Sequence, residues 1–550
     1  MIRQAAKEAH AKAHRAQVMA KQAARAELTI KTTLGWVHGV REEIDDATSP
    51  EIPIIVRTWR GIPFGQSTSG SHRFQAPRPA APWSGIRHCR EFGPVAPQPT
   101  YSWQDKIIGS EDCLSLDIVR PDTDEELPVV VYFHGGSFIV GSSHMQMLRG
   151  YRLAVAMNVV YVSVNFRLGA LGYLDLRSLP GDCVANPAVM DQILALQWVR
   201  DNIEFFGGKP QTVTAMGESA GGAAVLTLMT SPAAEGLFHR AIAQSPPITM
   251  IHSRAQSTLW ARELVRRLAL PRGATIDELR AQDVADIVRA GQSMMWRGGE
   301  LVHLNSTYAP TVDGDIIPRH PLEAFALGTQ SKVPLLIGTN SDEASFSKFM
   351  FQRESARRRA ALRLLASFDG NGAPAVLEAY GGGVERYEFA QLLADALFWA
   401  PTIRIAECHC ERSKTWMYRF DFASKTLKRL GLGAMHSMEL SNIFGDSSAS
   451  RASLLLRTGD SSEMQALTVA MQRHWAHFIH YGSPEPDWPE YTTSPNARRK
   501  RETLIFDAPT YIVADPKAVK RCAWENYEME EWGTGRPDIL ERIGFLLEGM

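Results

Sequence analysis

The segment 213–226, which reads Val-Thr-Ala-Met-Gly-Glu-Ser-Ala-Gly-Gly-Ala-Ala-Val-Leu, constrains the fold more than any other part of the chain. β-Branched residues precede a Gly-x-Ser-x-Gly pentapeptide, and small residues that favour a helix follow it. A sharp turn from a strand into a helix strains the turn residue, and the glycines on either side of Ser219 remove side chains that would clash there. We therefore expect the Ser219 hydroxyl to project above a sheet, where the positive end of a helix favours the anion formed when serine attacks a carbonyl.

The rest of the chain places this strand-turn-helix unit in a larger α/β fold. From about Leu34 to about Met250, β-rich runs alternate with helical ones, which predicts a large, mostly parallel central sheet flanked by helices. The segment 191–208 has apolar residues at helical spacing and ends in two glycines, as expected of a crossover helix. Helical insertions between about 250 and 430 are expected to form a cap and a substrate pocket. Strands are predicted at 114–119, 128–136, 159–166, 211–217, 240–245, 333–340, 415–422 and 502–509.

Composition favours a globular enzyme. Hydrophobic residues make up 45% and charged residues 22% of the 550 residues, which is close to the average soluble protein. The net charge of −1 argues against a nucleic-acid partner, because phosphate recognition needs an excess of clustered Lys and Arg. We expect residues 1–30 to be an alanine-rich charged extension, helical or frayed, and residues 31–550 to form a single catalytic domain.

Targeting, redox and metal signals are weak. No apolar run approaches the roughly 20 residues of a membrane-spanning helix, and the first 28 residues lack the apolar core of a secretory signal, so a cytoplasmic location is expected. The six cysteines are too few and too irregularly spaced for a disulfide scaffold. The sequence Cys408-His409-Cys410 has no second ligand pair at zinc-site spacing, so neither a metal nor a cofactor is expected.

Candidates for an acid and a base lie downstream of Ser219, in the order that such a turn requires. A serine hydroxyl attacks slowly unless a histidine accepts its proton and a carboxylate orients that histidine. Asp342 and Glu343 follow a predicted strand, at the sheet edge where ligands bind, so one of them is the candidate acid. His436 lies in a glycine-flanked loop that can reach this edge and is the preferred base. Three histidines of the C-terminal helical segment are interpreted as surface or packing residues: His474, His477 and His480.

The segment Tyr132–Phe138, Tyr-Phe-His-Gly-Gly-Ser-Phe, follows an apolar strand. Glycines after a strand let backbone N–H groups face a substrate closely. Paired with the N–H of the residue after the serine, such groups form an oxyanion hole. The occurrence of this segment together with the serine turn predicts acyl-transfer chemistry.

These motifs resemble, in their order along the chain, the type-B carboxylesterase and cholinesterase family of α/β-hydrolases. The likeness covers the chain from about Leu34 to the C-terminal region. The matching segments are 60–65, 111–118, 134–138, 165–174, 191–208, 217–222, 236–245, 338–346 and 433–445. The resemblance implies an α/β-hydrolase fold in which Ser219 is the nucleophile, Glu343 rather than Asp342 the acid, and His436 the general base and acid.

The same resemblance implies further roles. Two structural ion pairs are expected, one between Arg60 and Glu111 and one between Arg167 and Asp191. The implied oxyanion donors are the backbone N–H groups of Gly136, Ser137 and Ala220, with Gly135 shaping the loop.

The sequence also departs from the family pattern. Many members pair a cysteine near positions 92–98 with the one in the Glu-Asp-Cys-Leu motif, but no cysteine occupies that region here. Cys89 is the alternative partner for Cys113, and a protein with reduced thiols is the simpler account. The segments Gln-Ser-Pro-Pro at 244–247 and Ile-Pro-Arg-His-Pro at 317–321 are similar to bacterial members that cleave aryl carbamates.

We therefore predict a serine hydrolase that cleaves small carboxylic esters through an acyl-enzyme, which water then hydrolyses. Hydrolysis of a carbamate or an anilide by the same residues is the first alternative, and a non-catalytic adhesion protein of neuroligin type is the second. The oligomeric state stays open. Five apolar residues either line the substrate pocket or belong to the core: Trp103, Phe138, Met295, Trp296 and Phe346.

Overall fold

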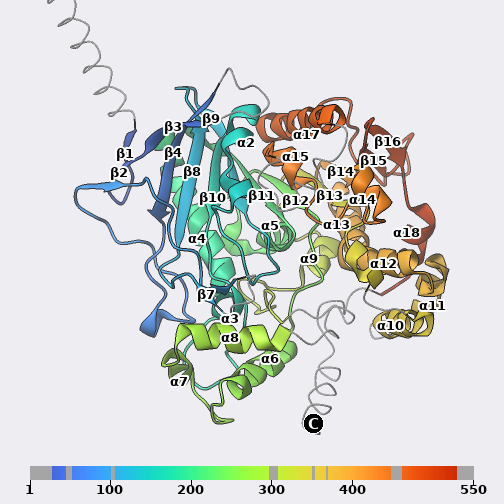
Figure 1. Cartoon of the computed structure of the whole chain (residues 1–550), viewed down its shortest axis with the longest axis horizontal. Coiled ribbons are helices and arrows are strands. Elements are labelled where there is room, and N and C mark those ends of the chain that lie inside the picture. The colour runs from blue at the N-terminus through green and yellow to red at the C-terminus, as the bar shows by residue number, and fades with distance from the viewer. Residues whose placement is uncertain are drawn as a thin grey trace, which may run out of the picture.

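The computed structural model describes residues 28–44, 53–100, 106–295, 307–349, 353–366, 369–446 and 461–528. These residues include an 11-stranded sheet, whose strands run side by side across the molecule (Figure 1). Its order is β16 (Tyr511–Ala514), β15 (Glu502–Phe506), β14 (Thr415–Phe420), β13 (Leu335–Asn340), β12 (Arg240–Gln244), β11 (Gly208–Glu218), β9 (Leu127–Phe133), β10 (Val160–Val164), β8 (Ser115–Pro121), β4 (Ile54–Pro63) and β3 (Val40–Ile44).

The sheet is mostly parallel, as the sequence predicts. Each neighbouring pair from β10 to β15 is parallel, and antiparallel pairs occur only towards the two edges. All eight predicted strands are present, with small differences at their ends. A separate 3-stranded sheet contains β1 (Thr29–Lys31), β2 (Trp36–His38) and β5 (Ile86–His88).

Helices cover both faces because successive side chains of the strands enter different cores. On β9, Val129 and Val131 belong to one core, whereas Val130 and Tyr132 belong to the other. The alternation follows the two-residue period of a strand, and an apolar residue at every position leaves both faces in need of cover. The first core is covered by α4 (Pro187–Asn202), α5 (Ala220–Thr230) and α13 (Ala400–Cys410), and the second by α2 (Tyr151–Met157), α15 (Leu440–Phe444) and α17 (Ser461–Tyr481).

The region between about 250 and 430 holds most of the remaining helices. The segment 275–291 contains two helices, because the carboxylate of Asp283 accepts the N–H of Ala285 at 2.7 Å and starts the second one. The helices are α6 (Arg254–Arg267), α7 (Ile276–Arg280), α8 (Val284–Met295), α9 (Pro321–Leu327), α10 (Glu354–Ala366), α11 (Ala373–Ala379), α12 (Arg386–Ala394) and α14 (Lys425–Arg429), with α18 (Ala518–Glu525) nearer the C-terminus. Figure 1 shows α6, α7 and α8 packed together at one end of the molecule.

Parallel strand order gathers the candidate segments at one edge of the sheet. β9, β11, β12 and β13 are consecutive neighbours and all run in the same direction. The residues that follow β9, β11 and β13 therefore leave the same edge. They are the glycine segment at 134–138, Ser219 and the turn 341–343.

One of the two predicted ion pairs is confirmed. Arg167 and Asp191 lie 2.6 Å apart, and their side chains are 2% and 0% exposed. The carboxylate also accepts the backbone N–H of Arg167 at 3.0 Å, so its charge is compensated by more than one donor.

The other predicted pair, Arg60 with Glu111, is wrong. Arg60 on β4 pairs with Glu42 at 2.5 Å, because β3 and β4 are neighbours in the sheet. Glu111 instead binds the guanidinium of Arg73 through two hydrogen bonds of 2.6 and 2.7 Å. The bidentate geometry and the burial of both side chains make Arg73 the structural partner.

All six cysteines are free thiols. Cys89 and Cys113 are 2% and 0% exposed in the same core, and no disulfide joins them. Burial raises the pKa of the Cys89 thiol to about 12, which keeps it protonated and unreactive.

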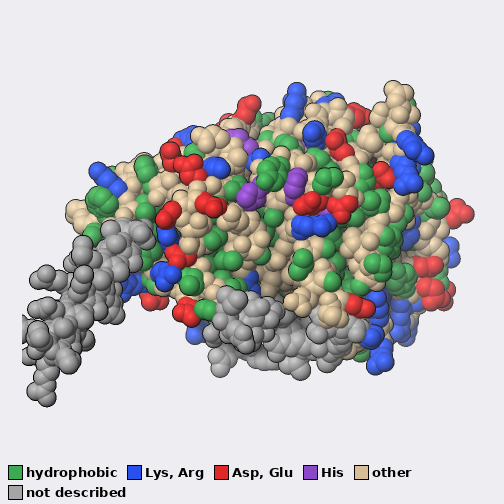
Figure 2. Space-filling view, turned by 90° about the horizontal axis from the view of Figure 1, so that it is seen from above, with side chains coloured by type: hydrophobic (Ala, Val, Ile, Leu, Met, Phe, Trp, Pro, Cys, Tyr) green, Lys and Arg blue, Asp and Glu red, His purple; other side chains and the backbone are tan. Residues whose placement is uncertain are grey.

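The expected extension falls almost entirely on residues 1–27, which lie outside the described residues. On the face drawn in Figure 2, positive and negative side chains are interspersed. Across the described ranges, no helix combines the length and apolar character that crossing a bilayer requires.

Candidate active site

Ser219 lies between β11 and α5 with a φ of 57° and a ψ of −126°, outside the regions of ordinary strands and helices. Two glycines permit this turn. A Cβ on Gly217 would stand 2.4 Å from the carbonyl oxygen of Gly221, and a Cβ on Gly221 would stand 1.9 Å from that of Phe133. The N–H of Ser219 donates to the carbonyl of Gln244 at 2.9 Å, which ties the turn to β12. The backbone therefore fixes the serine hydroxyl at the N-terminus of α5.

His436 and Glu343 meet Ser219 at the carboxyl edge of the sheet. The Nε2 atom of His436 lies 2.8 Å from Ser219 Oγ, and its Nδ1 atom lies 2.6 Å from Glu343 Oε2. Glu343 is 2% exposed, and its second oxygen accepts the N–H of Asn340 at 2.7 Å. The three residues chosen from the sequence thus lie in one chain of hydrogen bonds.

Asp342, the other candidate acid, binds the loop that carries His436. Its backbone N–H donates to the carbonyl of Ala434 at 3.0 Å, and its carboxylate accepts the N–H of Ala434 at 3.3 Å. The hydroxyl of Ser345 donates to the carbonyl of Leu432 in the same loop. These bonds fix the imidazole relative to the turn that carries Glu343.

The negative charges of two further buried glutamates act on the imidazole, and sequence reasoning missed both. An oxygen of Glu218 lies 3.4 Å from Nε2 of His436. Glu439 is fully buried and accepts a hydrogen bond from the side chain of Asn340 at 2.7 Å. Their positions in the sequence could have indicated them, because Glu218 directly precedes Ser219 and Glu439 follows His436 by three residues.

Burial and the neighbouring carboxylates shift the pKa values of His436, Glu218 and Glu439. Burial alone would lower the pKa of His436, but the negative charges of Glu218 and Glu343 outweigh burial and raise it to about 9. Burial also raises the pKa of Glu218, an effect that the nearby imidazolium opposes. Burial and repulsion from the other two carboxylates raise the pKa of Glu439 to about 8. The site therefore favours the protonated imidazole and a neutral Glu439.

The four residues predicted for the oxyanion hole border the serine turn. A Cβ on Gly135 would stand 3.2 Å from the Cβ of Ser219, so the glycine loop passes directly beside the serine. Gly136 and Ser137 have φ values of 121° and 55°. Among the described residues, no hydrogen bond occupies the backbone N–H groups of Gly136, Ser137 and Ala220. These donors are available to a bound oxygen atom.

The predicted pocket residues occupy different surroundings. Phe138 is 2% exposed, and its ring packs 4.7 Å from the ring of Tyr173. Phe346 is 54% exposed on the short helix η6 (Ser345–Phe349) that follows Glu343. Three predictions fall outside the described residues: Trp103, Trp296 and the side chain of Met295.

Phe398 contacts the site although the sequence did not single it out. Its ring lies 4.7 Å from the imidazole of His436, with an angle of 33° between the planes. In the sequence, the apolar residues around it gave no sign that it differs from a core residue. Its contact with His436 results from packing between distant segments.

The histidines of α17 bind elsewhere. His480 contacts the carbonyl of Met157 at 2.9 Å, and His477 that of Ser483 at 2.6 Å. His474 is buried against Trp488. These contacts are consistent with packing roles.

The metal candidate Cys408-His409-Cys410 has protein partners instead. His409 is buried with its ring nitrogens against Gln330 and the carbonyl of Val333. Within the part of the chain that the structure describes, no group of three or more His, Cys, Asp and Glu side chains is arranged to hold a metal ion.

Known proteins are similar to this chain over most of its length. A model of the carboxylesterase family matches residues 26–504. The para-nitrobenzyl esterase of Bacillus subtilis (strain 168) is 33% identical over 480 residues, which are 85% of this chain and 94% of that protein. The phenmedipham hydrolase of Pseudarthrobacter oxydans is 31% identical over 450 residues, 79% of this chain and 89% of that protein. A solved PNB esterase structure aligns with a TM-score of 0.78 and 30% identity, covering 90% of this chain and 100% of that one.

The fold and the site together define a serine hydrolase of the α/β-hydrolase class. The chain belongs to the carboxylesterase family, and it is an enzyme that hydrolyses carboxylic esters of small molecules. The predicted fold class and the predicted enzyme class are both confirmed.

Proposed function

We propose that Ser219, His436 and Glu343 are the catalytic triad of this esterase. The observation that carries the proposal is the hydrogen-bonded chain from Ser219 Oγ through the imidazole to Glu343, with distances of 2.8 and 2.6 Å. His436 takes the proton of Ser219 as the serine oxygen attacks the ester carbonyl carbon, and Glu343 stabilises the imidazolium. The imidazolium then gives its proton to the departing alkoxide, and an acyl-enzyme remains.

The second half of the reaction uses the same groups. His436 takes a proton from water as the water oxygen attacks the acyl carbon, and it returns that proton to Ser219 as the carboxylic acid leaves. In both halves, the N–H groups of Gly136, Ser137 and Ala220 donate to the negative oxygen of the tetrahedral intermediate, with Gly135 giving the loop room to approach. Phe138 and Phe346 are proposed to contact the substrate.

The test is active-site labelling with a fluorophosphonate, together with turnover of a chromogenic ester. Ser219→Ala should prevent labelling and lower kcat by about 10⁶-fold, because removal of the nucleophile leaves only binding and the oxyanion donors. Ser69→Ala, which removes an exposed hydroxyl, is the matched control and should be labelled like the wild type. Labelling of Ser219→Ala at the wild-type rate would refute the assignment.

Carbamate hydrolysis is the second candidate activity. Its support is the similarity to a protein named as phenmedipham hydrolase. A carbamate uses the same attack and the same proton transfers, with a less reactive carbonyl. A panel of an ester, a carbamate and an anilide with one shared aryl leaving group or acyl group would rank the three activities directly.

We also propose that residues 31–550 act as one catalytic domain, in support of which strands between Val40 and Ala514 share one sheet. Deletion of residues 1–27 should then leave kcat/KM unchanged.

A cytoplasmic location is proposed because all six cysteines are free thiols, as is usual in a reducing compartment. Cell fractionation tests the location.

A further inference from the structure

A π-helix lies next to the candidate triad. Residues Asp395–Trp399, between α12 and α13, have this rare geometry, and the N–H of Ala400 donates to the carbonyl of Asp395 five residues earlier. A π-turn inserts one extra residue into a helix, and each residue turns the helix by about 100°. The side chains near the insertion therefore point where an uninterrupted α-helix would not place them. Phe398, whose ring contacts His436, is one of them.

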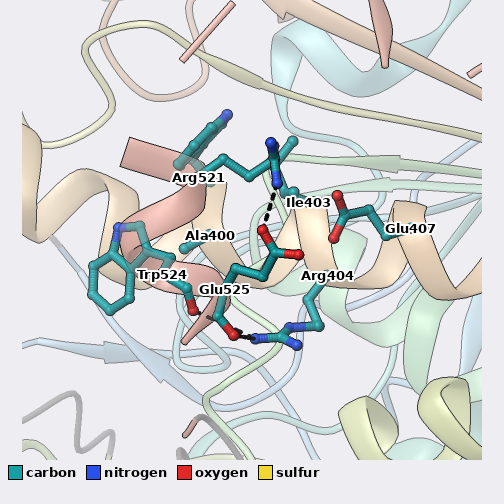
Figure 3. A pocket seen from close by; sticks show the side chains of 8 residues that line it. Ala400, Ile403, Arg404, Glu407, Arg521, Trp524 and Glu525 are labelled. Carbon is teal, nitrogen blue, oxygen red and sulfur yellow. Dashed lines mark hydrogen bonds and ion pairs between the residues drawn. The ribbon is translucent and has the colours of Figure 1, made fainter. Parts of the chain in front are cut away.

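The first residue of the π-helix is bound to the C-terminal segment. The carboxylate of Asp395 is 3% exposed and lies 2.7 Å from Nζ of Lys517, which immediately precedes α18. Its other oxygen accepts the hydroxyl of Tyr380 at 2.7 Å, and that hydroxyl also accepts the indole N–H of Trp524 on α18 at 2.9 Å. Figure 3 shows α18 lying across α13, with residues of both helices lining one pocket.

Lys517 contacts two other parts of the same region. Its ammonium group lies 4.9 Å from the ring centroid of Trp399, the last residue of the π-helix. It also donates to the side chain of Gln391 at 3.4 Å. Gln391 in turn donates to the carbonyl of Ser341 at 2.9 Å, two residues before Glu343. Lys517 therefore connects the C-terminal segment both to the π-helix and, through Gln391, to the turn that carries Glu343.

A pocket lies between α13 and α18. It is small and is rimmed by charged side chains that pair with one another, such as Arg521 with Glu525 (Figure 3). None of the three triad candidates lines it. Because α18 packs against α13, Lys517 at its start lies next to Asp395.

We propose that Lys517 and Asp395 are positioning residues that set the selectivity of the esterase among substrates of different bulk. Their ion pair holds the π-turn, and the π-turn holds the ring of Phe398 against His436, at the edge of the space that the substrate occupies. Pro401, two residues after the π-helix, has no N–H to donate and already disfavours a regular α-helix at this point. The ion pair fixes the irregular turn that results, and Nζ of Lys520 lies farther from the carboxylate, at 3.9 Å. Without Lys517 the turn repacks, and the ring of Phe398 shifts relative to the imidazole. This inference rests on the proposed triad, because Phe398 is placed by reference to His436.

The experiment compares kcat/KM for p-nitrophenyl acetate and p-nitrophenyl trimethylacetate, which differ only in the bulk of the acyl group. The ratio of the two values is insensitive to the fraction of folded enzyme, because unfolding removes both activities alike. Lys517→Met should change the ratio about tenfold, in the same direction as Phe398→Ala. Lys517→Arg, which keeps the charge and the reach, should restore the ratio. Arg521→Gln, which removes ion pairs of α18 that do not reach Asp395, is the control and should leave it unchanged.

A double variant tests whether Lys517 acts through Phe398. In the Phe398→Ala background, Lys517→Met should cause no further change in the ratio, because the ring that it positions is absent. An unchanged ratio in Lys517→Met, or an additive change in the double variant, would overturn the inference. Ser219→Ala separates the two proposals: activity retained in that variant would refute the triad, whereas an inactive Ser219→Ala with an unchanged Lys517→Met ratio refutes only the positioning role.

Discussion

The charge of Glu218 should set the pH at which the esterase becomes active. His436 accepts a proton from Ser219 only when it is neutral, and the surrounding carboxylates raise its pKa from 6.5 to about 9. The activity of the wild type should therefore rise as the pH increases towards 9. Glu218→Gln keeps the shape of the side chain and an oxygen that accepts a hydrogen bond from Ser437, but it removes the negative charge beside the imidazole.

The distance between the groups gives the size of the effect. Two unit charges 3.4 Å apart interact with about 5 kcal/mol at an effective dielectric constant of about 20, and with about 1.2 kcal/mol in bulk water. One pKa unit corresponds to about 1.36 kcal/mol, so these limits bracket a decrease of about 1 to 3.5 units. The His436 side chain is 27% exposed, which favours the lower half of that range. We expect the pKa of His436 to fall by about 1–2 units in Glu218→Gln.

The assay is the pH dependence of kcat/KM, which reports the ionisation of the free enzyme. An alkyl ester titrated at constant pH avoids the spontaneous hydrolysis of activated esters under basic conditions. The control is Glu235→Gln, which removes an exposed carboxylate without facing the site. If the acidic limb stays in place in Glu218→Gln, or moves equally in Glu235→Gln, then the neighbouring charge does not hold up the pKa of His436.

Three further predictions concern stability. Gly221→Ala should lower the free energy of unfolding by about 1–3 kcal/mol and reduce ester turnover, because the added Cβ would collide with a strand carbonyl. Gly273→Ala, whose added Cβ would meet open space, is the control. Urea unfolding measures the stability of each variant, and kcat measures its turnover. The raised pKa of Glu439 makes the folded state bind an extra proton between about pH 4.5 and 8, so stability falls as pH rises through that window. Glu439→Gln should remove up to about 1.4 kcal/mol per pH unit of that slope in unfolding titrations. In a double-mutant cycle, Arg73→Gln and Glu111→Gln should show a coupling of about 0.5–3 kcal/mol, and zero coupling would contradict the assigned ion pair.

The strands and the position of the nucleophile could be predicted because both depend on local sequence. A buried parallel strand must be apolar on both faces, so an apolar run such as Val129–Phe133 predicts a strand. The turn at Ser219 needs glycines at fixed positions. The acid and the base followed from topology, since parallel neighbours end at one edge, and from the family resemblance, which selected Glu343 over Asp342.

Contacts between segments that are far apart in the sequence could not be predicted from the sequence. Arg60 and Arg73 both precede apolar segments, and only the strand pairing of β3 with β4 directs Arg60 to Glu42. The contact of Phe398 with His436 depends on an inserted residue in a helix, and Pro401 beside it signals an irregular helix without specifying where the ring of Phe398 points. In both cases, the partner is decided by the path of the backbone, which residue types alone do not specify.

The buried acids explain why the site needs more than three residues. Burial and repulsion between neighbouring carboxylates raise the pKa of Glu218 and of Glu439, so it is costly for both to be ionised beside a neutral imidazole. Attack by the serine turns the ring into a cation, which relieves that repulsion at the moment when the oxyanion also forms. Above about pH 9, where the imidazole is neutral before the attack, the carboxylates therefore stabilise the charged state of the reaction more than the state that precedes it, which is the condition for an interaction to accelerate the chemical step. Their effect on rate should consequently appear in kcat rather than in KM.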